Sequence, residues 1–185
     1  MSSEPHVARE TPAPNLFTGA DVAAILRERG WVATEENKFS PEFDAWCERA
    51  AAMLGSHAAD REALSELLSL IVHYDAARVL EKKESHAVLA RYGARDVVRR
   101  LAWALLEGGP LDSNRFKEII TAMKEGSDLS SRDLFHPIRL ALAGRAGDGE
   151  LDRVILLIDE AAAIPFTEPV KSARVRIMEF CAALV

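Results

Sequence analysis

Apolar residues recur along most of this chain at spacings of three and four, the period of a helix that buries one face. No segment alternates in the manner of a β-strand for more than a few residues. The pattern therefore predicts a series of α-helices. Their expected ranges are 19–29, 41–54, 61–80, 85–92, 94–107, 113–125, 137–143, 151–164 and 168–183.

Cap residues and glycines mark the ends of several of these helices. Thr18 and Ser40 can accept a hydrogen bond from the first turn of the helix that follows each of them. Gly30 and Gly144 are stop signals, because glycine tolerates the left-handed conformation that ends many helices. Pro137 is predicted to be the first residue of its helix, where its missing N–H costs nothing.

The run Gly108, Gly109, Pro110 is the strongest break in the helical pattern. We therefore expect an all-α fold, a helical bundle or superhelix of two small subdomains that meet at this break. The expected organisation is a disordered arm over residues 1–16, a first helical subdomain over 17–108 and a second over 109–185.

The composition is that of a globular protein, with 49% hydrophobic and 28% charged residues. The net charge is −6, so no overall basic balance points to nucleic acid. The acidic excess lies entirely in residues 1–90, whereas residues 91–185 carry 14 basic and 14 acidic side chains. An anionic partner is therefore expected to meet the second half.

Cysteine usage and hydropathy indicate the compartment. Cys47 and Cys181 fit no metal or redox motif; they could form one bridge, but two reduced thiols are the favoured interpretation. No window approaches the roughly 20 apolar residues of a membrane span. The first residues show no basic-then-apolar signal pattern. We expect a cytoplasmic protein with no membrane partner.

The sequence shows no catalytic signature. Its histidines form no zinc-binding pair, and it contains neither a phosphate-binding glycine loop nor a nucleophile elbow. We therefore predict no catalytic residue, no metal site and no cofactor. His73, Tyr74 and Asp75 fall within the predicted helix 61–80, where they form either a proton relay or a polar boundary position.

Arginine spacing suggests an anion-binding surface. Arg91, Arg95 and Arg99 are four residues apart and share one face if the helix spans Gly93 or restarts just beyond it. Guanidinium groups on such a face can bind successive phosphates; the alternative is a solvated face with a local pair to Asp96. Two further basic groups are Arg132, Arg139 and Arg145, and Lys171, Arg174 and Arg176.

Stacking on RNA bases needs exposed aromatic side chains. Phe135, next to His136, is the expected exposed platform. The other candidates fit core stripes better: Trp31, Trp46, Trp103 and Phe116.

Residues 133–144 read Asp-Leu-Phe-His-Pro-Ile-Arg-Leu-Ala-Leu-Ala-Gly. This segment resembles a recurrent stretch of bacterial-type glutamyl-tRNA synthetases, in which Pro-Leu-Arg precedes a small apolar run and Thr-Gly. The likeness continues to Leu157 and extends more faintly over residues 18–185. It implies the helical region that grips the tRNA anticodon loop. By this resemblance Arg139 contacts the anticodon and Leu151 is an apolar loop contact; the alternatives are a buried helix-linking arginine and an ordinary core leucine.

The chain departs from that family in two ways. Neither the His-x-Gly-His-type nor the Lys-Met-Ser-Lys-type signature of the synthetase catalytic half occurs. The family's Gly-Pro-Gly-Leu or Thr-Pro-Gly-Leu loop reads Asp-Gly-Glu-Leu at residues 148–151. The added carboxylates repel RNA phosphates.

These features predict a non-catalytic module that binds tRNA, glutamate tRNA by resemblance, and no DNA. The alternative is a protein-interaction or regulatory module that kept the fold, lost the RNA and binds a protein partner. The residues expected to contact RNA are Arg91, Arg95, Arg99, Arg132, Phe135, His136, Arg139, Arg145 and Leu151.

Overall fold

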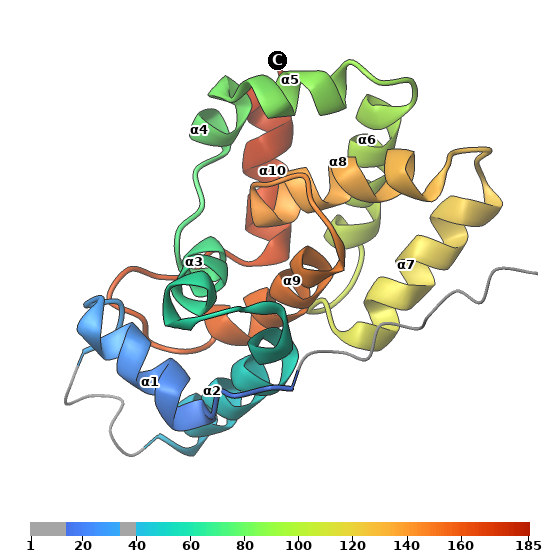
Figure 1. The fold of residues 1–185 in the computed structure, drawn as a ribbon. Coiled ribbons are helices and arrows are strands. Elements are labelled where there is room, and N and C mark those ends of the chain that lie inside the picture. The colour runs from blue at the N-terminus through green and yellow to red at the C-terminus, as the bar shows by residue number, and fades with distance from the viewer. Residues whose placement is uncertain (1–13, 34–39) are drawn as a thin grey trace, which may run out of the picture.

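The computed structural model describes residues 14–33 and 40–185, and all regular structure within these ranges is helical (Figure 1). The predicted all-α fold is confirmed, whereas most of the predicted arm over residues 1–16 lies outside the described residues. The helices are α1 (Gly19–Glu28), α2 (Pro41–Leu54), α3 (Arg61–Val72), α4 (Ala76–Glu81), α5 (Lys83–Leu89), α6 (Ala94–Leu106), α7 (Ser113–Glu125), α8 (Ser131–Ala143), α9 (Gly149–Ala162) and α10 (Ala173–Ala183), with a 3₁₀ turn at Gly55–His57.

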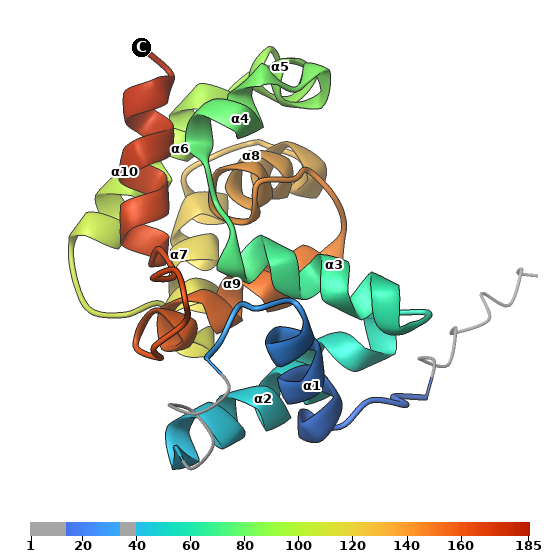
Figure 2. The ribbon, with the colours of Figure 1, turned by 90° about the vertical axis from the view of Figure 1, so that its left-hand side faces the viewer.

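Helix α9 lies at the centre of the molecule, in contact with α2, α3 and α8, while α10 stands beside α6 (Figure 2). Trp46 of α2 donates a buried hydrogen bond from its indole N–H to the carbonyl of Leu157 in α9, at 3.1 Å. Thr167 donates from its backbone N–H to the carbonyl of Trp31 at 2.8 Å. Helices from both sides of the predicted boundary at residues 108 and 109 thus contribute to one hydrophobic core. None of the described helices is long and apolar enough to cross a membrane.

The predicted cap residues begin and end the helices as expected. Thr18 and Asp21 form a reciprocal capping box at the start of α1, and the Ser40 hydroxyl accepts from the backbone N–H of Phe43 at the start of α2. Gly144 ends α8 in the left-handed conformation with φ of 76°. Capping groups satisfy N–H donors that helix termini leave unpaired, which is why these short signals fix the boundaries.

The predicted helix over residues 61–80 is wrong in its middle, because the chain breaks there into α3 and α4. Tyr74 turns inward at the break, and its hydroxyl donates to the carbonyl of Ala141 in α8 at 2.6 Å. Asp75 then caps α4 by accepting from the backbone N–H of Arg78. A buried long-range hydrogen bond thus overrides a local pattern that favours one continuous helix.

Two helix starts differ from the prediction by five residues or more. Helix α8 begins at Ser131, and Pro137 lies inside it rather than at its first position. Ser130 caps α8 and donates from its hydroxyl to Asp133 at 2.6 Å, a start signal that lies well upstream of the proline. Helix α10 begins after its cap Ser172 rather than near residue 168.

The two cysteines are free thiols, as the sequence predicts. Burial raises the pKa of Cys47 to about 12. Burial also raises the pKa of Cys181, which is half-buried beside α6. Both thiols are therefore protonated, and only weakly nucleophilic, at neutral pH.

Candidate nucleic-acid interface

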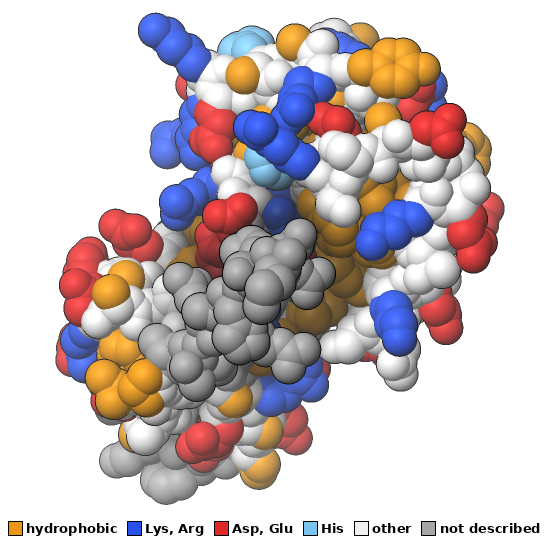
Figure 3. Space-filling model, turned by 45° about the vertical axis from the view of Figure 1, so that its right-hand side comes forward, with side chains coloured by type: hydrophobic (Ala, Val, Ile, Leu, Met, Phe, Trp, Pro, Cys, Tyr) orange, Lys and Arg blue, Asp and Glu red, His pale blue; other side chains and the backbone are white. Residues whose placement is uncertain are grey.

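Helix α8 presents one polar face to solvent, beside the loop that precedes α9. Arg132, Phe135 and Arg139 follow one another at helical spacing on this face, with His136 beside them. Together with Asp148 they line a shallow hollow of about 540 Å³. Lys and Arg side chains gather on the upper part of the molecule in this region (Figure 3). The structure thus brings the aromatic and basic residues predicted from the motif together.

The Arg139 side chain is largely buried and binds other residues of the same chain. Its guanidinium donates to both carboxylate oxygens of Asp152, at 2.8 Å each, and to the carbonyl of Gly147 at 2.6 Å. It also stacks over Phe135, 4.8 Å from the ring centre, and its side chain is only 12% exposed. These contacts hold the α8–α9 loop, and the side chain of Leu151 packs in the core just beyond it.

The pKa of His136 reflects the positive charge of the side chains around the hollow. Burial lowers its pKa first, and the neighbouring guanidinium groups of Arg132, Arg139 and Arg91 lower it further, against a smaller opposing effect of Asp148. His136 is therefore neutral at neutral pH, in a positive local field on an acidic protein. Neither it nor any other described histidine belongs to a group of three side chains that could hold a metal ion.

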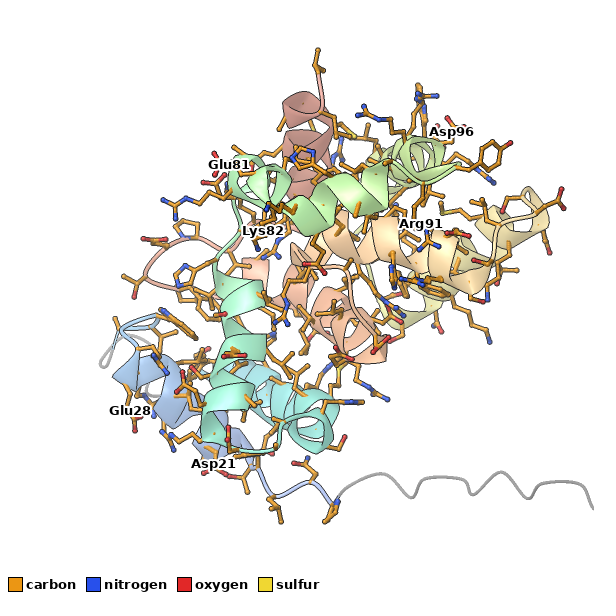
Figure 4. All side chains as sticks on the ribbon, turned by 45° about the horizontal axis from the view of Figure 1, so that its top comes forward. Asp21, Glu28, Glu81, Lys82, Arg91 and Asp96 are labelled. Atoms are coloured by element: carbon orange, nitrogen blue, oxygen red, sulfur yellow. The ribbon has the colours of Figure 1, made fainter. Side chains whose placement is uncertain are left out.

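The remaining predicted arginines differ in how they are paired. Arg91 reaches from the turn before α6 to Asp133 of α8, with 3.0 Å between nitrogen and oxygen (Figure 4). Arg99 pairs with Asp96 at 2.9 Å on the exposed side of α6. Three exposed arginines form no ion pair within the described part of the chain: Arg95, Arg132 and Arg145.

A family model described as an anticodon binding domain matches residues 22–162. The chain belongs to the anticodon-binding domain family. The match covers all of α2 to α9, and so the whole of the α8 hollow and the arginines at the start of α6. It identifies a tRNA-binding type of module and names no particular synthetase. No curated protein and no solved structure matches the chain.

The anticodon-binding domain exposes two aromatic residues that were not predicted to be exposed. Tyr92 is 92% exposed and Trp103 is 64% exposed, so the prediction that Trp103 lies in the core is wrong. The buried stripe of α6 runs through Val97 and Leu101, and Trp103 lies on the opposite side of that helix. Phe135, the predicted platform, is half-buried between Lys124 and Arg139.

The third basic group of the sequence does not form a surface in this domain. Arg176 is fully buried, and its guanidinium donates to backbone carbonyls of α3 and α8. Lys171 pairs with Glu179 at 2.7 Å. Only Arg174 of this group is exposed without an ion pair among the described residues.

Proposed function

We propose that this anticodon-binding domain is a non-catalytic cytoplasmic module that binds tRNA, with glutamate tRNA as its partner. The observation that carries the proposal is the exposed Arg132 in the α8 hollow, with the exposed Arg145 in the loop that follows α8; neither forms an ion pair with the described residues, and both lie within the region that matches the family. The protein has a net charge of −6, so the charge of this basic surface is opposite in sign to that of the whole protein. A local positive field on an acidic protein favours a defined anionic ligand over non-specific binding.

Within this proposal the predicted residues divide into two roles. Arg132 and Arg145 are exposed and form no ion pair with the described residues, so they can bind phosphate oxygens directly, as guanidinium groups do in many RNA complexes. Arg139 and Leu151 position the α8–α9 loop from inside, because the first is bound to Asp152 and the second is buried. The loop rather than the Arg139 guanidinium would then face the anticodon.

We expect the double variant Arg132→Gln, Arg145→Gln to bind glutamate tRNA more weakly, because two phosphate contacts are lost. The affinity should fall roughly tenfold or more at low salt, and the slope of log affinity against log salt should become shallower by about 2. Fluorescence anisotropy across a salt series measures both quantities.

A matched control for this experiment is Arg29→Gln, Arg61→Gln, which removes the same charge from the surface between the end of α1 and the start of α3, outside the α8 hollow. Both control side chains are about half exposed and form surface ion pairs, so the fold should tolerate their loss. Equal salt slopes for the two double variants would contradict a specific role for the α8 hollow.

One observation favours a second candidate function, a protein-interaction module that has lost RNA. The arginine implied to contact the anticodon is already bound to Asp152, and the exposed carboxylate of Asp148 lies in the same hollow. If the module binds tRNA, native protein purified at low salt should carry RNA, seen as a raised ratio of absorbance at 260 to 280 nm. A ratio typical of pure protein, together with no tRNA binding in the titration, would favour the second candidate.

A further inference from the structure

Tyr92 and Trp103 lie at the border of one cleft between α6 and the loop that joins α7 to α8. The cleft encloses about 900 Å³ and is also lined by arginines and by Leu129. Large aromatic side chains are usually well buried, so two exposed ones at the border of one cleft indicate an interaction site. The α8 hollow described above shares no lining residue with this cleft.

The position of Tyr92 is fixed by the turn that follows it. Gly93 has φ of 77°, a conformation that favours glycine, and it packs against Leu129 from the α7–α8 loop. A Cβ atom at this glycine would lie 2.9 Å from a Leu129 methyl carbon, so the turn and the loop are in close contact. From the α6 wall, Arg100 donates to the carbonyl of Ala122 at 3.3 Å and joins α6 to the end of α7.

We propose that this cleft binds unpaired bases of an RNA strand, one stacked on Tyr92 and another on Trp103. This proposal rests on the tRNA binding proposed above. Tyr92 lies in the turn before α6, whereas Trp103 lies nine residues beyond Ala94, the first residue of that helix, or roughly 14 Å along its axis at about 1.5 Å per residue. That separation suits two different bases of one strand rather than a single base held between two rings. Stacking on aromatic faces is a common way to hold single-stranded RNA.

The charges around the cleft fit the same ligand. Arg91 and Arg99 neutralise the nearby carboxylates Asp133 and Asp96, while Asp128 forms no ion pair within the described residues. An unpaired carboxylate can accept a hydrogen bond from the exocyclic amino group of a base that has left its helix. A mixture of guanidinium planes, aromatic faces and one free acceptor favours unpaired bases over a plain phosphate ligand.

The test compares an RNA hairpin that has the sequence of the glutamate tRNA anticodon arm with a blunt duplex of its stem alone. We expect Tyr92→Ala and Trp103→Ala each to weaken hairpin binding about tenfold, as the loss of one stacked base does, and to leave duplex binding and the salt slope unchanged. Tyr92→Phe and Trp103→Phe keep an aromatic face and should retain most of the affinity. Met178→Ala removes another exposed apolar side chain, on α10 and outside the cleft, and is the matched control.

Intrinsic fluorescence gives a second measurement, because Trp103 is the exposed member of the three tryptophans. The hairpin should quench this emission, and Trp103→Phe should abolish most of the quenching. If the alanine variants bind the hairpin as the wild type does, the stacking proposal is overturned while tRNA binding stands, and a protein ligand becomes the better occupant. If the wild type binds neither RNA, both proposals are overturned.

Discussion

Replacing Arg176 by methionine is expected to lower the free energy of unfolding by about 4 kcal/mol, a large part of the 5–15 kcal/mol typical of a folded domain. The Arg176 side chain is completely buried. Its guanidinium donates to the carbonyls of Leu70, Ile71 and Leu142, and to that of Lys171 just before α10. Methionine fills part of the volume but donates to none of these oxygens.

The cost follows from where these carbonyls lie. Leu70 and Ile71 are in the last turn of α3, and Leu142 is in the last turn of α8, where helix carbonyls have no partner within their own helix. The partial negative charges of the two helix ends stabilise the buried cation. Burial lowers the pKa of Arg176 to about 10, so the group remains charged at neutral pH.

Chemical denaturation followed by circular dichroism measures the loss of stability. A loss of this size should lower the melting temperature by roughly 10 °C, since about 1 kcal/mol shifts it by 2–4 °C in a chain of this length. Arg174→Met is the matched control, because Arg174 is exposed on the same helix and its replacement should change stability by less than about 0.5 kcal/mol. An Arg176→Met variant within about 1 kcal/mol of the wild type would contradict this account.

Arg176 also shows why part of the structure could not be read from the sequence. The caps of α1 and α2 and the glycine that ends α8 are local signals, and the structure confirms them. Arg174 and Arg176 look alike in the sequence, yet one is exposed and the other binds carbonyls from helices more than thirty residues away. The break at Tyr74 has the same origin, because its partner is a distant carbonyl in α8.

The candidate interface was only partly predictable for a related reason. The motif in α8 was recognisable because residues 133–144 are contiguous in the sequence and resemble a known family, but the shared face of Arg132, Phe135 and Arg139 was not predicted, since the helix was expected to begin at Pro137 rather than at Ser131. The cleft beside Tyr92 and Trp103 needs the α7–α8 loop as its second wall, and no local pattern indicates which loop packs there. The position of Trp103 opposite the buried stripe of α6 was the one available signal.

Replacing Arg139 by methionine is expected to lower the free energy of unfolding by about 3 kcal/mol, because it leaves the partly buried carboxylate of Asp152 without its bidentate partner. The carbonyl of Gly147 loses its donor in the same variant, so the α8–α9 loop should become less ordered. Asp152→Asn should have a smaller effect, since the amide still offers one acceptor. A double-mutant cycle measured by urea denaturation should give a coupling energy of about 1–2 kcal/mol between the two side chains.

The same variants separate the two possible roles of Arg139 in binding tRNA. If Arg139 positions the loop, Arg139→Met and Asp152→Asn should both weaken binding, and the double variant should be little worse than Arg139→Met alone, with an unchanged salt slope. If Arg139 contacts the anticodon directly, Asp152→Asn releases its guanidinium, so binding should tighten and the salt slope should steepen. The contacts of Arg139 favour the first outcome, because its guanidinium already donates to Asp152 and Gly147 and stacks on Phe135. Tighter binding by Asp152→Asn would therefore overturn the positioning role and restore Arg139 as a direct RNA contact.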